Sequence, residues 1–63
     1  MKVNEFLKTI DENTQVVFST KRYGFMWAGK VLFVKTQFMP AFYEEQVLST
    51  SKDKYGNISV VIE

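Results

Sequence analysis

The sequence predicts a single α+β domain spanning residues 1–63, in which a short helix precedes a four-stranded sheet. Three observations predict this class. Apolar residues near the start of the chain recur at helical spacing, whereas after residue 14 apolar and β-branched residues form short runs bounded by turn residues. The chain has 63 residues, enough for one small core. It is also 46% apolar, which is too hydrophobic for a disordered segment.

The helix is expected at residues 3–10. Its apolar positions share one face, Asn4 is the candidate N-terminal cap, and the polar run 11–13 ends the helix. A short amphipathic helix of this kind covers the open end of a small barrel or docks on a partner. The apolar positions are Val3, Phe6, Leu7 and Ile10.

The second of the expected strands is long, and its apolar residues fall on both faces, as in a central strand. Gly29 within it is a natural site for a bulge or bend that passes the strand from one sheet to another. These features favour either a four-stranded antiparallel sheet with the helix on one face, or a small, partly open barrel of the SH3, Sm-like or OB type. The strands are expected at 15–20, 25–35, 46–51 and 58–62.

Charge is nearly balanced, with eight Lys and Arg against seven Asp and Glu, so its distribution bears on function more than its sum. If the strands run up and down, the turns at 21–24 and 52–57 lie at the same end of the sheet. The sequence then predicts a basic, aromatic tip there, with ordinary solvated turn lysines as the alternative. The tip would hold Lys21, Arg22, Lys52 and Lys54 beside Tyr23 and Tyr55, and the acids Asp11, Glu12, Glu44, Glu45 and Glu63 would lie at the other end.

The residue types that most enzymes use for catalysis are missing. Without cysteine or histidine the chain has no thiol nucleophile, no imidazole acid or base and no ligand set for structural zinc. The neighbouring acids at 11–12 and 44–45 point to opposite sides of an extended chain. The three glycines are scattered, so none belongs to a phosphate-binding loop. We therefore predict a non-enzymatic binding protein that uses no cofactor and no metal.

The absence of cysteine fits a reducing cytoplasm. No basic segment followed by an apolar one opens the chain, and its apolar runs fall far short of the ~20 residues that span a bilayer. We expect a cytoplasmic protein that does not enter a membrane. Because a core of this size often depends on a partner chain, a homodimer is expected as an alternative to a monomer.

The stretch Lys21-Arg22-Tyr23-Gly24-Phe25-Met26 resembles the RNP1 signature of RNA-recognition motifs and cold-shock domains, and 31–34 is similar to the second cold-shock strand motif. The resemblance implies that Tyr23, Phe25 and Phe33 stand outward and stack on bases. The alternative is that Phe25, Trp27 and Phe33 fill the core, Trp27 above all. The leading hypothesis is the binding of single-stranded nucleic acid through Lys21, Arg22, Tyr23, Phe25, Lys52, Lys54 and Tyr55.

Residues 1–18, MKVNEFLKTIDENTQVVF, resemble the start of many short proteins of bacterial phages and conjugative elements, where one helix precedes a small barrel. This resemblance implies an inhibitor or regulator that occupies a surface of a host or phage protein. The segment 36–45 is a candidate surface, because its apolar residues crowd into a loop with an acidic rim. Alternatively, the loop folds back and caps the barrel. The candidate partner-binding residues are Phe38, Met39, Phe42, Tyr43 and Glu44.

Overall fold

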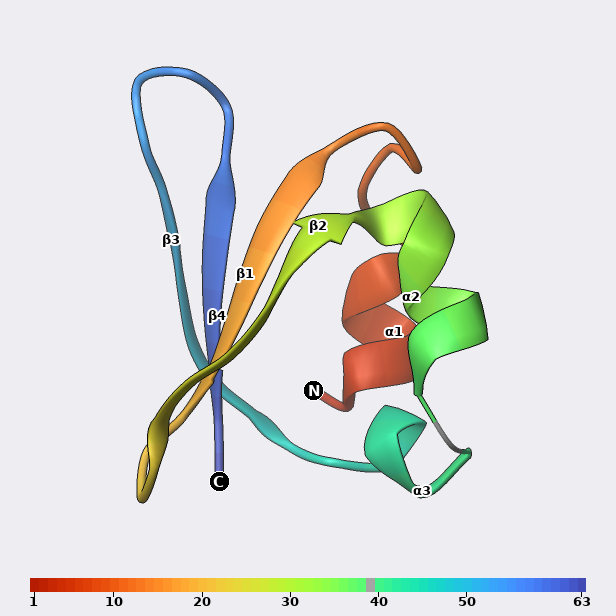
Figure 1. Cartoon of the computed structure of the whole chain (residues 1–63), viewed down its shortest axis with the longest axis vertical. Coiled ribbons are helices and arrows are strands. Elements are labelled where there is room, and N and C mark those ends of the chain that lie inside the picture. Colours follow the sequence, from red (N-terminus) through yellow and green to blue (C-terminus); the bar gives the residue numbers. More distant parts are fainter. Residues whose placement is uncertain (39) are drawn as a thin grey trace.

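The protein packs three short helices against one side of a four-stranded mixed sheet (Figure 1). The computed structural model describes residues 1–38 and 40–63, and for Lys35 it describes the backbone but not the side chain. The predicted α+β class is confirmed. Over the described residues the sheet is open and does not close into a barrel. The elements are α1 (Val3–Leu7), β1 (Gln15–Thr20), β2 (Gly24–Lys30), α2 (Val31–Gln37), α3 (Pro40–Tyr43), β3 (Val47–Lys52) and β4 (Ile58–Ile62).

The N-terminal helix is shorter than expected, because α1 ends at Leu7. Both the backbone N–H and the hydroxyl of Thr9 donate to the Phe6 carbonyl, at 3.0 and 2.7 Å, and the chain tightens there into a turn. Lys2 is the N-cap residue, and its backbone N–H donates to Glu5 Oε1 at 3.0 Å. The expectation that Asn4 caps the helix is therefore wrong.

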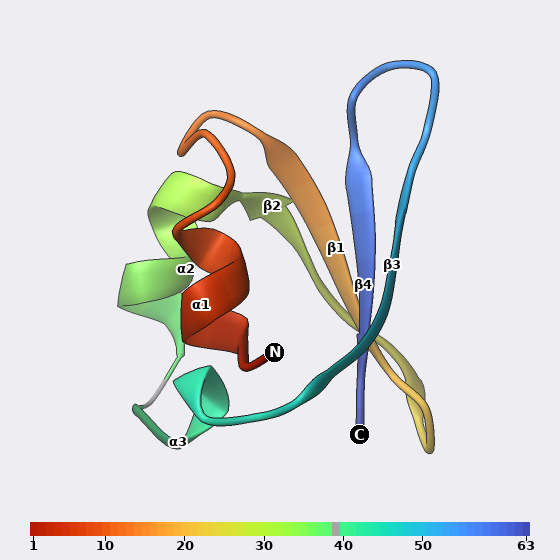
Figure 2. The same cartoon turned by 180° about the vertical axis from the view of Figure 1, so that it is seen from behind.

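The sheet has the strand order β2-β1-β4-β3. β1 pairs antiparallel with β2 and β4 pairs antiparallel with β3, but the two central strands, β1 and β4, are parallel. The purely antiparallel sheet predicted from the sequence is therefore wrong. The reason is that α2 and α3 follow β2 and return the chain along the sheet, so β3 begins at the end where β2 began (Figures 1 and 2).

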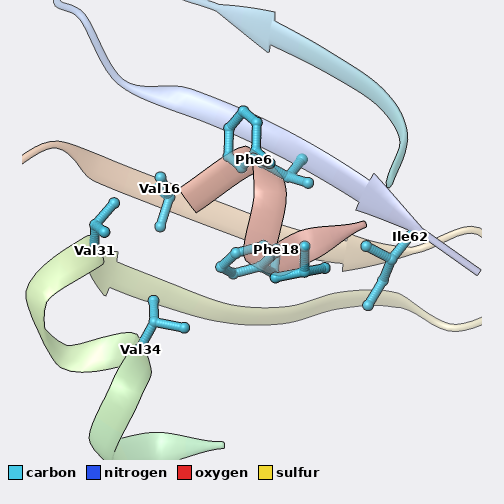
Figure 3. Packing of buried hydrophobic residues seen from close by; sticks show 8 residues of the cluster. Phe6, Val16, Phe18, Val31, Val34 and Ile62 are labelled. Atoms are coloured by element: carbon cyan, nitrogen blue, oxygen red, sulfur yellow. The ribbon is translucent and has the colours of Figure 1, made fainter. Parts of the chain in front are cut away.

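The core lies between the helices and one face of the two central strands (Figure 3). Alternation along the strands turns every second residue toward the helices, and the residues between them face the opposite side, which no helix of the described chain covers (Figures 1 and 2). Phe18 is fully buried in the middle of β1; burying a side chain of this size stabilises a fold by about 1.5–3 kcal/mol. The other buried residues are Val3, Phe6, Val16, Val31, Val34, Val60 and Ile62.

The strand expected at 25–35 ends at Lys30, and α2 follows directly. The backbone N–H groups of Val31 and Leu32 donate to the carbonyls of Thr14 and Glu12, at 3.0 and 2.8 Å, which ends the pairing of β2 with β1. The apolar run 31–34 fits a helix as well as a strand, because Val31 and Val34 then share a buried face. Residues 31–34, which the sequence likened to a cold-shock strand, therefore form part of a helix, and Phe33 does not belong to the sheet.

Gly29 is not a bulge, since it pairs in register with Val16. The irregularity lies at Met26, where the pairing passes from Phe18–Trp27 to Ser19–Phe25. Gly29 leaves room for the indole of Trp27, because a Cβ there would lie 2.7 Å from the Cη2 atom of the ring. The half-buried indole is also held by Phe18 and Phe38, with ring centroids at 6.4 and 5.4 Å.

A methyl group at position 29 should therefore displace the Trp27 ring. We expect Gly29→Ala to lower the free energy of unfolding by about 1–3 kcal/mol, the usual cost of overpacking. Urea denaturation of wild type, Gly29→Ala, Trp27→Leu and the double variant measures the coupling. In the Trp27→Leu background the cost should vanish, because the methyl group no longer meets a ring. An equal cost in both backgrounds would show that the ring is not the obstacle.

Candidate nucleic-acid interface

Three aromatic rings are the most exposed of the large apolar side chains in the described chain. Tyr23 is 81% exposed, Tyr55 77% and Phe25 70%. Each ring lies within three residues of a lysine or arginine in the sequence. Large apolar groups normally gain free energy by burial, so these three rings in water are candidates for stacking or docking. The alternative in which Phe25 fills the core is wrong.

The turn between β1 and β2 presents Lys21, Arg22 and Tyr23 to solvent. Gly24 closes it with φ +82°, in the left-handed region that favours glycine. The Tyr23 backbone N–H donates to Thr20 Oγ1 at 2.8 Å, and that of Lys21 donates to the Ile62 carbonyl at 2.7 Å. These hydrogen bonds fix the turn to the end of β4.

The turn between β3 and β4 is organised by the carboxylate of Asp53. Its Oδ1 accepts the backbone N–H groups of Tyr55 and Asn57, at 2.8 and 2.9 Å, and its Oδ2 accepts the Asn57 side chain at 3.1 Å. Loss of water around the carboxyl raises its pKa, but the hydrogen bonds from Asn57 and Tyr55 outweigh this effect and the net pKa is lowered. Asp53 therefore stays charged at neutral pH and partly offsets Lys52 and Lys54.

Within this turn, Lys54 Nζ lies 5.1 Å from the centre of the Tyr55 ring. A cation at this distance from a tyrosine ring is attracted by the negative face of the ring. The contact therefore places positive charge beside an exposed aromatic surface.

The two turns lie at opposite ends of the sheet, so the single tip predicted from the sequence is wrong (Figure 1). Because β1 and β4 run in the same direction, the turn after β1 and the turn before β4 cannot share an end. Glu63 also lies beside the β1–β2 turn, where it was not expected. Lys21, Arg22, Tyr23 and Phe25 thus belong to one end, and Lys52, Lys54 and Tyr55 to the other.

The uncovered face of the sheet connects the two ends. Phe25 pairs with Ser19, whose neighbour Phe18 points into the core, so both residues face the uncovered side. By the same argument Lys30, which pairs with Gln15, lies on this face at the other end of β2. Apart from Leu48, which follows the core-facing Val47 at the irregularity in β3, the other residues of the face are small or β-branched; they are Val17, Ala28, Ser49, Ser51, Ser59 and Val61.

The second candidate surface, in residues 36–45, is largely engaged with the core. Phe38 and Phe42 stack on each other with centroids 4.1 Å apart, and the Phe42 ring lies edge-on to Phe18 at 5.1 Å. The Tyr43 hydroxyl donates to the Val34 carbonyl at 3.0 Å. These half-buried rings do not protrude as an exposed loop would. Met39 lies outside the described residues.

Glu44, the last of the predicted partner-binding residues, is exposed, and Lys2 Nζ donates to its Oε2 at 2.6 Å. The hydrogen bond and the charge of Glu44 raise the pKa of the Lys2 ammonium. The pair is solvent-exposed, and such pairs contribute little to stability. It fastens the segment after α3 to the start of α1.

Sequence reasoning missed a groove of about 420 Å³ between α1 and α2. Its walls are mainly apolar, and Asn4 Oδ1 beside it is buried without a hydrogen-bond partner among the described residues. The groove was hidden because Leu32 was expected on a strand. It is lined by Asn4, Leu7, Lys8, Ile10, Glu12, Val31, Leu32 and Tyr43.

Comparisons with protein families, curated proteins and solved structures find no match for the chain. The RNP1-like resemblance of 21–26 and the phage-like resemblance of 1–18 therefore stay predictions. In the described part of the chain, no three His, Cys, Asp or Glu side chains gather so that they could hold a metal ion. Nor does that part contain a helix with the length and apolar character needed to cross a membrane.

Proposed function

We propose that this protein binds single-stranded nucleic acid in the cytoplasm and catalyses no reaction, using the uncovered sheet face and the turns that border it. One observation carries the proposal. The most exposed aromatic rings, Tyr23, Phe25 and Tyr55, stand beside cations at the two ends of a sheet face that no described helix covers. Stacking of one base on such a ring contributes about 1–3 kcal/mol and tolerates any base.

The separation of the two turns decides how a strand would lie. A strand of six residues spans about 20 Å, so one nucleic-acid chain contacts both ends only by crossing the sheet. The small side chains between the ends allow close approach, and Phe25 offers a stacking surface. Sheet-based RNA-binding modules recognise bases on an open sheet in this manner. Lysines at both ends, Lys21 and Lys52 among them, would contact phosphates.

Phe25→Ala should weaken binding of a labelled oligonucleotide of about 12 residues by roughly tenfold, because one stacking surface is lost. Fluorescence anisotropy at a series of salt concentrations measures the affinity. The logarithm of the binding constant should fall linearly with the logarithm of salt concentration, and Lys21→Ala should reduce that slope by about 0.7.

Phe33→Ala is the matched control, because Phe33 is an exposed ring (50%) on α2, on the helix side of the sheet, and the proposal does not use it. Its affinity should stay within about twofold of wild type, as for an ordinary surface substitution. An absence of binding at about 50 mM salt, or equal losses for Phe25→Ala and Phe33→Ala, would contradict the proposal.

Binding of a protein partner is the second candidate function, and the α1–α2 groove favours it. Leu32 lines the groove with 44% of its surface exposed, and the ring of Tyr43, one of the predicted partner-binding residues, forms part of the wall. An apolar side chain of a partner would fill such a groove. The phage-like start of the chain supports the same function.

Selection from a random peptide library tests this second candidate. Enriched peptides should bind wild type and the control Leu48→Asp. They should not bind Leu32→Asp, because that substitution places a charge in the groove. Phe42→Ala is unsuitable as the probe, because Phe42 packs on Phe18 and its removal would damage the fold. Peptides that bind Leu32→Asp as well as wild type would exclude the groove.

A further inference from the structure

The β1–β2 turn contains a hollow that combines an aromatic ring with charges of both signs. It measures about 610 Å³ and is lined by Lys21, Arg22, Tyr23 and Glu63. Thr20 and Ile62 are paired ends of the parallel central strands, and the Lys21 N–H donates to the Ile62 carbonyl at 2.7 Å. The fold therefore brings Glu63, the residue after Ile62, to the turn.

The charged groups of this hollow do not neutralise one another. No ion pair within 4.0 Å joins the Glu63 carboxylate to Lys21 or Arg22, although all three residues line the same hollow. All three are exposed. Hydrogen-bond donors on Lys21 and Arg22 and acceptors on Glu63 are thus available to a molecule that enters the hollow, together with the exposed Tyr23 ring.

We propose that this hollow is a subsite for one unpaired guanine, an inference that rests on the nucleic-acid binding proposed above. Guanine is the base whose Watson–Crick edge presents two adjacent donors, N1–H and the N2 amino group, and a carboxylate such as Glu63 accepts both. Its other edge presents O6 and N7, the acceptors that arginine binds in bidentate fashion. Tyr23 supplies the stacking surface and Lys21 reaches the phosphate.

The other bases fit this set of groups less well. Adenine and cytosine each present one amino donor next to a ring nitrogen that accepts, and that acceptor would face the Glu63 carboxylate. Thymine and uracil present a single N–H between two carbonyl oxygens. The volume is also adequate, because sites for small ligands measure about 300–1,000 Å³. The residues of the hollow therefore select guanine by chemistry and not by size.

The test compares oligothymidylates of about 12 residues that carry either thymine or one guanine at the centre, since a single guanine cannot form four-stranded assemblies. Wild type should bind the guanine oligonucleotide about tenfold more tightly. Inosine, which lacks the N2 amino group, and 7-deazaguanine, which lacks N7, should each lose part of this preference. These two probes report separately on Glu63 and Arg22.

Glu63→Gln should reduce the preference for guanine to the part that Arg22 supplies and leave oligothymidylate binding intact, because the amide replaces one of the two acceptors by a donor. Glu45→Gln is the charge-matched control and should keep the preference, since Glu45 is exposed and does not line the hollow. Equal affinity of wild type for the guanine and thymine oligonucleotides overturns the guanine subsite and leaves the proposed function standing. Failure to bind either oligonucleotide overturns both.

Discussion

The parallel pairing of β1 with β4 determines where the exposed groups of this protein lie. The pairing holds Phe18 opposite Val60 in the middle of the core and Thr20 opposite Ile62 at one end. It separates the two basic turns and brings the end of β4 to the β1–β2 turn, while the helices, all on one side, leave the other sheet face to the solvent (Figures 1 and 2). The nucleic-acid proposal and the guanine subsite use these consequences, so the direction of β4 is the constraint on which the account depends.

Much of this structure follows from local patterns. The runs 15–20 and 58–62 are rich in β-branched and aromatic residues and bounded by turn residues, and both are strands whose alternate residues are buried. Gly24 and Gly56 occupy turns with positive φ, where glycine is favoured. The sequence left two places open for Phe25, on the surface as the RNP1 resemblance implies or in the core, and the structure has it exposed. These features depend on residues that are close in sequence.

The direction of β4 could not be predicted in this way. It depends on the run 31–34, whose apolar residues satisfy a strand and a helix equally well. Hydrogen bonds from Val31 and Leu32 to the loop after α1 favour the helix, and these partners are distant in sequence. Because the helices α2 and α3 replace a strand after β2, β3 and β4 reverse relative to a simple meander. The position of Glu63 beside the β1–β2 turn follows from that reversal, and the groove beside Leu32 follows from the helical form of α2.

The most direct test measures the distance between the two turns. The chain has no cysteine, so Arg22→Cys and Tyr55→Cys introduce two spin labels at unique positions. Parallel β1 and β4 place the labels at opposite ends of the sheet. Double electron–electron resonance should therefore give a label separation above about 20 Å, the length of a six-residue strand. A separation near 10 Å, about the width of two strands, would show that the turns share an end and would contradict the account.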